Sequence, residues 1–370
     1  MPKQSNKHPT DAEPITLSDH GWFFVGGNYI ERDNGSFRTG GMYVEHFAPE
    51  QVRQPWPVVM IHGGGQTGTN FTATPDGRRG WVHDFLRAGY AVYVIDQPER
   101  GRSGHMPGTD GGFPLLRYNT RRVEQRFTAP ANAKLWPQAA RHTQWPGDGV
   151  QGDPVFDQFY ASQVEMLTDG AAIETLTRDG GAALLDRIGP AILLTHSQSG
   201  PFGWLIADAR PERVKAILSI EPNGPPFHEV DFKGAPDWFD YDHTPARVWG
   251  ITRAPLTYDP PAASPEELSP VPDETPADDD LVQGYLQSEP ARKLPHLQGI
   301  PILIATAEAS YHATYDHCTS RYLTQAGVEH EFLRLADKGL RGNGHMVMLE
   351  KNSHEIADLL IDWLAERLSG

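Results

Sequence analysis

The chain has few cysteines, a deficit of basic side chains and no long apolar run. Its single cysteine, Cys318, allows no disulfide within the chain and supplies no pair of thiols for a structural zinc site. Its 32 basic residues are outnumbered by 48 acidic residues, and the net charge of -16 repels phosphate backbones and anionic membranes. We therefore expect neither nucleic acid nor a membrane as a partner, and a fold that rests on its apolar core.

Targeting and membrane signals are also missing from the sequence. The first residues, MPKQSNKHPTDAEP, are polar and lack the apolar stretch of a secretory signal. No window approaches the roughly 18 apolar residues that a membrane span needs. These features predict a cytoplasmic location.

Short apolar runs, each followed by a glycine-rich or charged turn, predict buried parallel strands. Five of them begin at Pro57, Tyr90, Ala191, Val214 and Ile300. Segments with helical character lie between or after them, from Trp81, over 156–187, from Pro201 and over 355–367. This alternation predicts an α/β fold with a mostly parallel, doubly wound sheet, built as one domain over residues 1–370.

Two long stretches interrupt the alternation and predict lid-like insertions. The first, at about 104–155, is rich in aromatic residues, which favours a lid that lines a pocket. The second, at about 223–298, contains an acidic, proline-rich part that is either a lid or a solvated excursion. From composition, we expect an apolar or aromatic substrate group to meet Trp136, Trp145, Phe156 and Tyr160.

The segment Thr195-His196-Ser197-Gln198-Ser199-Gly200 lies directly between an apolar strand and a helix. A nucleophile elbow needs small residues two positions before and after its serine, and Thr195 and Ser199 meet that need. The turn would present the Ser197 hydroxyl at the helix N-terminus, which favours the negative charge that develops during attack. The alternative is an ordinary serine-rich helix cap.

A glycine-rich turn, His62-Gly63-Gly64-Gly65, follows the strand that begins near Pro57. Glycines let backbone N–H groups approach an oxyanion, and we expect the donors to be Gly64 and Gln198. A phosphate loop is the other interpretation, but the Walker lysine pattern and the GxGxxG spacing are both missing.

The base should be a histidine in a loop after the last strand, because the chain order in such hydrolases is nucleophile, acid, histidine. His345 lies in such a loop, whereas His354 falls where the last helix begins. The acid has two candidates. Glu221 ends the strand after the nucleophile helix, and Glu308 ends the next strand, where most such folds keep their acid.

Taken together, these motifs resemble the α/β-hydrolase superfamily from about residue 40 to the end of the chain. More closely, THSQSG, SIEPNG and GNGHM resemble a group of bacterial serine esterases typified by esterase 713 of Alcaligenes. In that group the acid follows the sixth strand, which implies Glu221. The group's best-known member has adjacent cysteines where this chain has Gly64 and Gly65, so any geometry that a cysteine pair imposes on this loop is absent here.

The resemblance implies a serine hydrolase that cleaves a small carboxylic ester or lactone without a cofactor, and it suggests a homodimer. A lactonase, amidase or C–C hydrolase with the same triad, or a non-catalytic ligand-binding member of the fold, are the alternatives.

Two further groups of residues receive a structural interpretation from the sequence. We expect no metal, because His312, Asp316 and His317 fit a polar helix start better than a ligand set. Arg100 and Arg102 are expected to make structural ion pairs or lid contacts.

Overall fold

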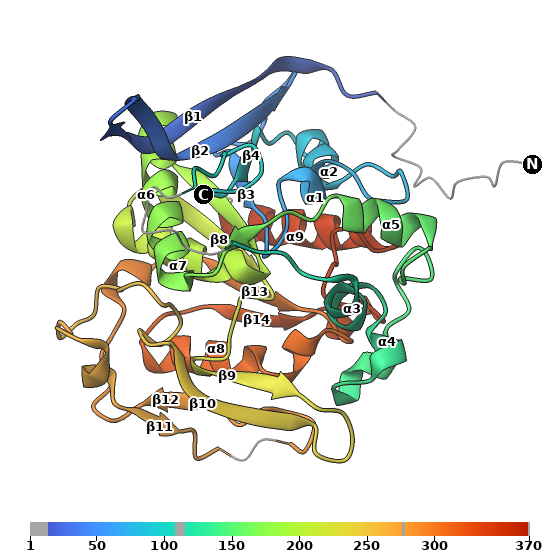
Figure 1. Cartoon of the computed structure of the whole chain (residues 1–370), viewed down its shortest axis with the longest axis vertical. Coiled ribbons are helices and arrows are strands. Elements are labelled where there is room, and N and C mark those ends of the chain that lie inside the picture. The colour runs from blue at the N-terminus through green and yellow to red at the C-terminus, as the bar shows by residue number, and fades with distance from the viewer. Residues whose placement is uncertain (1–13, 108–114, 276–277, 369–370) are drawn as a thin grey trace, which may run out of the picture.

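The computed structural model describes residues 14–107, 115–275 and 278–368, which are arranged around one large sheet (Figure 1). Six of its strands are parallel, and an antiparallel hairpin extends one edge. In spatial order, the eight strands are β1 (Leu17–Arg32), β2 (Gly35–Pro49), β4 (Val92–Asp96), β3 (Val58–Ile61), β7 (Ala191–His196), β8 (Val214–Ile220), β13 (Ile302–Thr306) and β14 (Glu331–Arg334). The mostly parallel sheet and all five predicted strands are confirmed.

Alternate side chains of the central strands enter two separate apolar clusters, as the two-residue period of a strand requires. Met60 and Leu194 face helices α2 (Trp81–Arg87) and α9 (Ser353–Leu368) on one side of the sheet. On the other side, Val59 and Leu193 face a set of helices consisting of α6 (Gly170–Ile188), α7 (Gly200–Ala209) and α8 (Asp316–Gln325). Burial on both faces explains why these strands appear in the sequence as continuous apolar runs.

The helical stretch predicted over 156–187 is two helices rather than one. Helix α5 (Pro154–Ala161) ends before the short strand β6 (Met166–Leu167), and α6 begins after it. The Asp153 side chain accepts the Phe156 N–H and the Asp169 side chain accepts the Ala172 N–H, so each aspartate caps a new helix.

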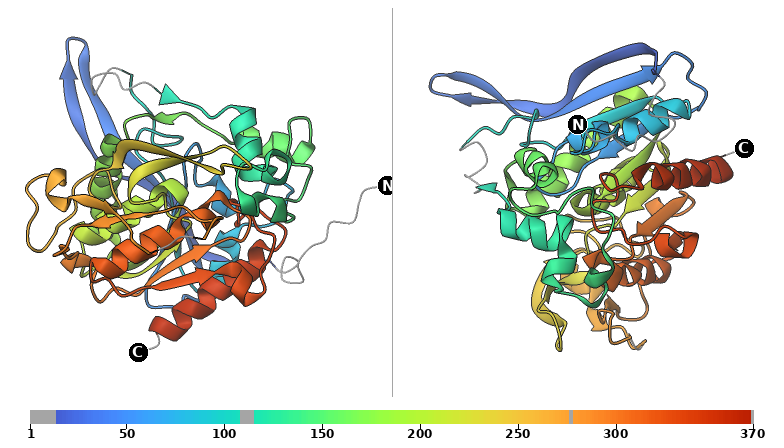
Figure 2. Two further views of the ribbon diagram at one scale, coloured as in Figure 1. Left: turned by 90° about the horizontal axis from the view of Figure 1, so that it is seen from below. Right: turned by 90° about the vertical axis from the view of Figure 1, so that its right-hand side faces the viewer.

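The β1–β2 hairpin was not predicted, and it extends beyond the rest of the sheet (Figure 2). Its large side chains include Trp22, which is 65% exposed, so the apolar alternation of a half-buried strand is weak here. The sequence Asp33-Asn34-Gly35 at its tip is a hairpin-turn signal that identifies it in retrospect.

The described residues of both predicted insertions leave the sheet and add short elements. The first contains β5 (Leu115–Leu116), α3 (Thr120–Val123), the π-helical turn Glu124–Thr128 and α4 (Pro130–Ala133). The second contains β9 (Phe227–Phe232), β10 (Phe239–Arg247), β11 (Pro270–Pro272) and β12 (Tyr285–Gln287). The remaining elements are α1 (Thr69–Thr72) and 3-10 turns at Pro137–Arg141, Ser197–Ser199, Pro265–Leu268, Pro295–Leu297, Tyr311–Thr314 and Leu335–Lys338.

Candidate active site

Ser197 lies in a sharp turn between β7 and α7 and has a backbone φ of +58°. A β-carbon makes this left-handed conformation unfavourable, and such strain is concentrated at functional sites. The neighbouring Ser199 holds the turn, because its Oγ accepts the His196 N–H at 2.7 Å and donates to Ile61 O at 2.7 Å. The structure therefore has the strained strand-to-helix geometry expected of a nucleophile elbow.

The glycine-rich turn after β3 approaches this elbow closely. A β-carbon at Gly63 would lie 3.1 Å from Ser197 Cβ, so only glycine fits there without displacement. Gly64 and Gln198, the two predicted oxyanion donors, both line the cavity above Ser197. The structure therefore brings both donor residues to the same place as the serine.

Arg100 joins the two donor segments, a contact that the sequence did not reveal. Its Nη1 donates to Gly63 O at 3.1 Å and to Gln198 Oε1 at 3.0 Å. The side chain is buried and makes no ion pair with the described residues, and burial lowers its pKa to about 10. Arg102, in contrast, makes the predicted ion pairs, with Asp96 and Glu45.

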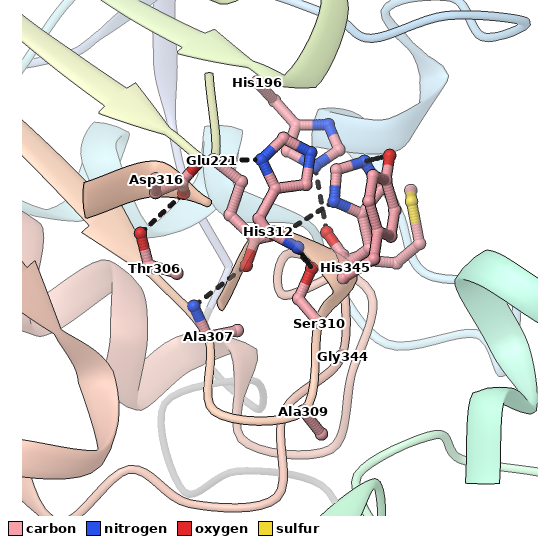
Figure 3. A network of polar contacts seen from close by, with 12 residues as sticks. His196, Glu221, Thr306, Ala307, Ala309, Ser310, His312, Asp316, Gly344 and His345 are labelled. Atoms are coloured by element: carbon pink, nitrogen blue, oxygen red, sulfur yellow. Dashed lines mark hydrogen bonds and ion pairs between the residues drawn. The ribbon is translucent and has the colours of Figure 1, made fainter. Parts of the chain in front are cut away.

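His345 and Glu221 form a short, buried hydrogen bond, in which His345 Nδ1 lies 2.6 Å from Glu221 Oε2 (Figure 3). Glu221 directly follows β8, with φ at +49°. The Ala307 N–H donates to its Oε1 at 2.9 Å, and the Ser310 hydroxyl donates to its Oε2 at 2.8 Å. Three donors thus fix this carboxylate against the histidine ring.

The two competing candidates from the sequence make contacts elsewhere. Glu308 accepts the Gly342 N–H at 2.9 Å and pairs with Arg341 at 3.2 Å, so it braces the loop that carries His345. His354 Nδ1 lies 2.8 Å from Asp84, which ties α9 to α2. The structure therefore places Glu221 and His345 together, in preference to either competitor.

The other ring nitrogen of His345 contacts Tyr311, which the sequence analysis did not single out. The Tyr311 Oη lies 3.2 Å from His345 Nε2, and Tyr311 also lines the cavity. No hydrogen bond joins Ser197 Oγ to His345 within the described part of the chain. Bonds between a nucleophile and its base are often long before substrate binds, and here Tyr311 occupies Nε2.

A second histidine–carboxylate pair lies against the first. The His312 ring stacks on His345, with centroids 4.7 Å apart and planes inclined by 7°, and its Nδ1 lies 3.0 Å from Asp316 (Figure 3). Burial lowers the pKa of His345 well below its ordinary value. Burial, together with the charge of Asp316, raises the pKa of Glu221 well above its ordinary value. The surroundings thus favour a neutral imidazole, the form that accepts a proton.

Among the described residues, one group of three side chains could in its spacing hold a metal ion, and this group belongs to the candidate active site. The set comprises His196, Glu221 and His345, with ligand atoms within 4.8 Å of one another. Glu221 and His345 are bonded to each other, and His196 Nε2 lies 2.9 Å from His345 O. The three residues weighed from the sequence do not converge, because His317 turns to Val282 O at 3.1 Å.

The predicted pocket aromatics do not line the cavity, which has a volume of about 400 Å³. Trp136 is buried and donates to Ala309 O, and Trp145 packs edge-on against Phe159. Phe156 stacks on Tyr160. These rings pack against other side chains instead of facing the cavity. The prediction was wrong because composition does not show which way a side chain faces. The aromatic wall consists instead of Tyr118, Phe127, Phe202, Phe232, Tyr311 and Tyr315.

A model of the α/β hydrolase family matches residues 58–359, a range that contains every residue of this site. The chain belongs to the α/β hydrolase family. A probable secreted lipase of a fungus (Fungal sp. strain ATCC 74256) is 46% identical over 350 residues, which cover 94% of this hydrolase and 89% of the relative.

Among solved structures, this hydrolase is similar to that of a novel bacterial esterase. The TM-score is 0.64, at 24% identity, over 96% of this chain and 98% of the other, which supports the fold. No helix in the described part of the hydrolase is long and apolar enough to cross a bilayer.

Proposed function

We propose that the protein is a serine hydrolase that cleaves carboxylic esters or lactones, with Ser197, His345 and Glu221 as its triad. The observation that carries this proposal is the strained Ser197 turn in the same site as the 2.6 Å His345–Glu221 pair. The names of the fungal and bacterial relatives, a lipase and an esterase, support ester hydrolysis.

The proposed reaction gives each of these groups a role. His345 Nε2 accepts the Ser197 proton as Oγ attacks the carbonyl carbon, and Glu221 stabilises the imidazolium that forms. The backbone N–H groups of Gly64 and Gln198 bind the oxyanion. The imidazolium then protonates the leaving alcohol, and an acyl-enzyme remains until water, activated by His345, releases the acid. These steps involve no cofactor.

The first experiment combines turnover with labelling of the nucleophile. The parent enzyme and Ser197→Ala are assayed with p-nitrophenyl esters from acetate to decanoate, and a fluorophosphonate probe reports the reactive serine. We expect kcat to fall about a thousandfold or more in Ser197→Ala, with loss of labelling. If the parent is not labelled and hydrolyses no ester, the non-catalytic binding role is the better explanation.

The alternative activities of the same triad are tested with other substrates. Lactones report lactonase activity, anilides report amidase activity and vinylogous ketones report C–C hydrolase activity. We expect the esters to give the highest kcat/KM. An amidase or a C–C hydrolase would instead prefer the anilide or the ketone.

Location and oligomeric state remain predictions. The fungal relative is named as secreted, in contrast to the cytoplasmic location that we expect, and cell fractionation distinguishes the two. The homodimer suggested by the resemblance is tested by sedimentation.

A further inference from the structure

The cavity above Ser197 is lined by three arginines and three carboxylates. Some of these side chains already have hydrogen-bond or ion-pair partners. Glu229 accepts from Arg253 at 3.0 Å and from the buried Arg247 at 2.8 Å. Glu174 accepts the N–H groups of Arg253 and Ala254, both at 2.7 Å, and burial raises its pKa to about 7. Arg253 and these two carboxylates therefore already have partners.

The other two arginines of the cavity, Arg122 and Arg126, are poorly neutralised. Arg126 Nη2 lies 3.4 Å from Asp231, whose side chain is 74% exposed, and such an ion pair contributes little. The guanidinium of Arg122 makes no ion pair with any residue that the structure describes. Two cations without firmly held partners thus line the cavity of a chain whose net charge is -16.

Both arginines lie over tyrosine rings that reach the candidate active site. The Arg126 guanidinium is 5.4 Å from the centre of the Tyr311 ring, and the Tyr311 hydroxyl contacts His345 Nε2. Arg122 lies 4.6 Å from the centre of the Tyr118 ring, whose hydroxyl is 3.1 Å from where a β-carbon on Gly64 would be. One tyrosine ring therefore separates Arg126 from His345, and another separates Arg122 from the glycine-rich turn.

We propose that the site selects esters that carry a carboxylate, which Arg122 and Arg126 bind while the ester carbonyl lies at Ser197. This inference rests on the proposed ester hydrolysis. A guanidinium stacked on a ring still presents its planar N–H edge, which matches a carboxylate in two parallel hydrogen bonds. A single negative charge suits the site, because Glu229 and Asp231 also line the cavity and oppose a second one.

The test compares 3-acetoxybenzoate with 3-acetoxybenzamide, which share the acetyl group and the ring position and differ in charge. We expect kcat/KM of the parent enzyme to be about tenfold or more higher for the anion, mainly through KM. Raising the salt concentration from about 0.05 to about 0.5 M should reduce this preference, because salt screens partly exposed charges.

Variants separate recognition of the anion from a structural role of the arginines. Arg122→Gln and Arg126→Gln should each lower the anion-to-amide ratio of kcat/KM, and the double variant should bring it close to one. Arg121→Gln is the matched control, because Arg121 is exposed on the same short helix and does not line the cavity. Arg121→Gln should keep the parent ratio. If Arg122 and Arg126 have only a structural role, their replacement should lower kcat/KM for both esters and leave the ratio unchanged.

The two proposals fail in different ways. A parent ratio near or below one, or a ratio that both arginine substitutions leave intact, overturns anion selection while ester hydrolysis stands. Labelling of Ser197 without turnover of the anionic ester also overturns the selection. If the parent hydrolyses neither ester and Ser197 is not labelled, the proposed function itself fails.

Discussion

Replacing Glu221 by glutamine exchanges one carboxylate oxygen for an NH2 group. Both carboxylate oxygens of Glu221 accept hydrogen bonds in this site. The carboxylate accepts the Ala307 N–H on Oε1, and it accepts both the Ser310 hydroxyl and His345 Nδ1 on Oε2. A glutamine has one oxygen and one NH2 for these positions. If its oxygen keeps the Ala307 N–H, the NH2 group faces Nδ1 and favours the tautomer with the proton on Nε2, which cannot act as the base.

The opposite orientation is also costly. With its oxygen toward His345, the glutamine turns NH2 against the Ala307 N–H, and two buried donors then face each other at a cost of about 1–3 kcal/mol. The imidazolium loses its counter-charge in either case. We expect Glu221→Gln to lower kcat about a thousandfold to ten-thousandfold, equivalent to about 4–5.5 kcal/mol of transition-state stabilisation.

The assay is steady-state hydrolysis of p-nitrophenyl acetate, with a folded circular dichroism spectrum required of each variant. Glu308→Gln is the matched control, because Glu308 lies one strand away and contacts Arg341 and the Gly342 N–H. It should retain kcat to within about threefold, as expected for a partly exposed ion pair. The reasoning is refuted if Glu221→Gln keeps more than a tenth of the parent kcat, or if Glu308→Gln is the more damaging change.

Two further predictions concern the oxyanion turn and the base. Arg100→Met should lower kcat about tenfold to a hundredfold with a smaller change in KM, because Gly63 and Gln198 lose the side chain that joins them; an unchanged kcat in a folded variant contradicts this. Because burial lowers the pKa of His345 below its usual 6.5, the imidazole stays neutral at lower pH, and the acid limb of the kcat/KM profile should have its midpoint below pH 6.5. A midpoint at or above that pH, measured with a non-ionising ester, contradicts the burial argument.

The strand-to-helix turn of Ser197 and the loop position of His345 were predictable because their signals are local. Ser197 and His345 are each identified by the strand, turn or loop immediately around them. The carboxylate that contacts His345 was not, because Glu221 and Glu308 follow neighbouring parallel strands and either can reach the same region. Which of the two carboxylates meets His345 depends on the path of the backbone after each strand. From the sequence, only the resemblance favoured Glu221.

The pocket and its supporting contacts could not be read from the sequence. Trp136 and Trp145 were expected to face the substrate, but the fold directs them into the hydrophobic core. The contacts of Arg100 and Tyr311 depend on side chains that are brought together from distant segments. Chain composition does not determine the direction of a side chain, and long-range contacts leave no local pattern.

The position of the acid has an evolutionary consequence. Since β8 and β13 are neighbours, a carboxylate at the end of either can in principle serve the same histidine. A lineage carrying both could transfer the role from one strand to the other by small adjustments, without passing through an inactive ancestor. In this protein, the segment after β13 contributes Ser310 and Tyr311 instead, which contact Glu221 and His345.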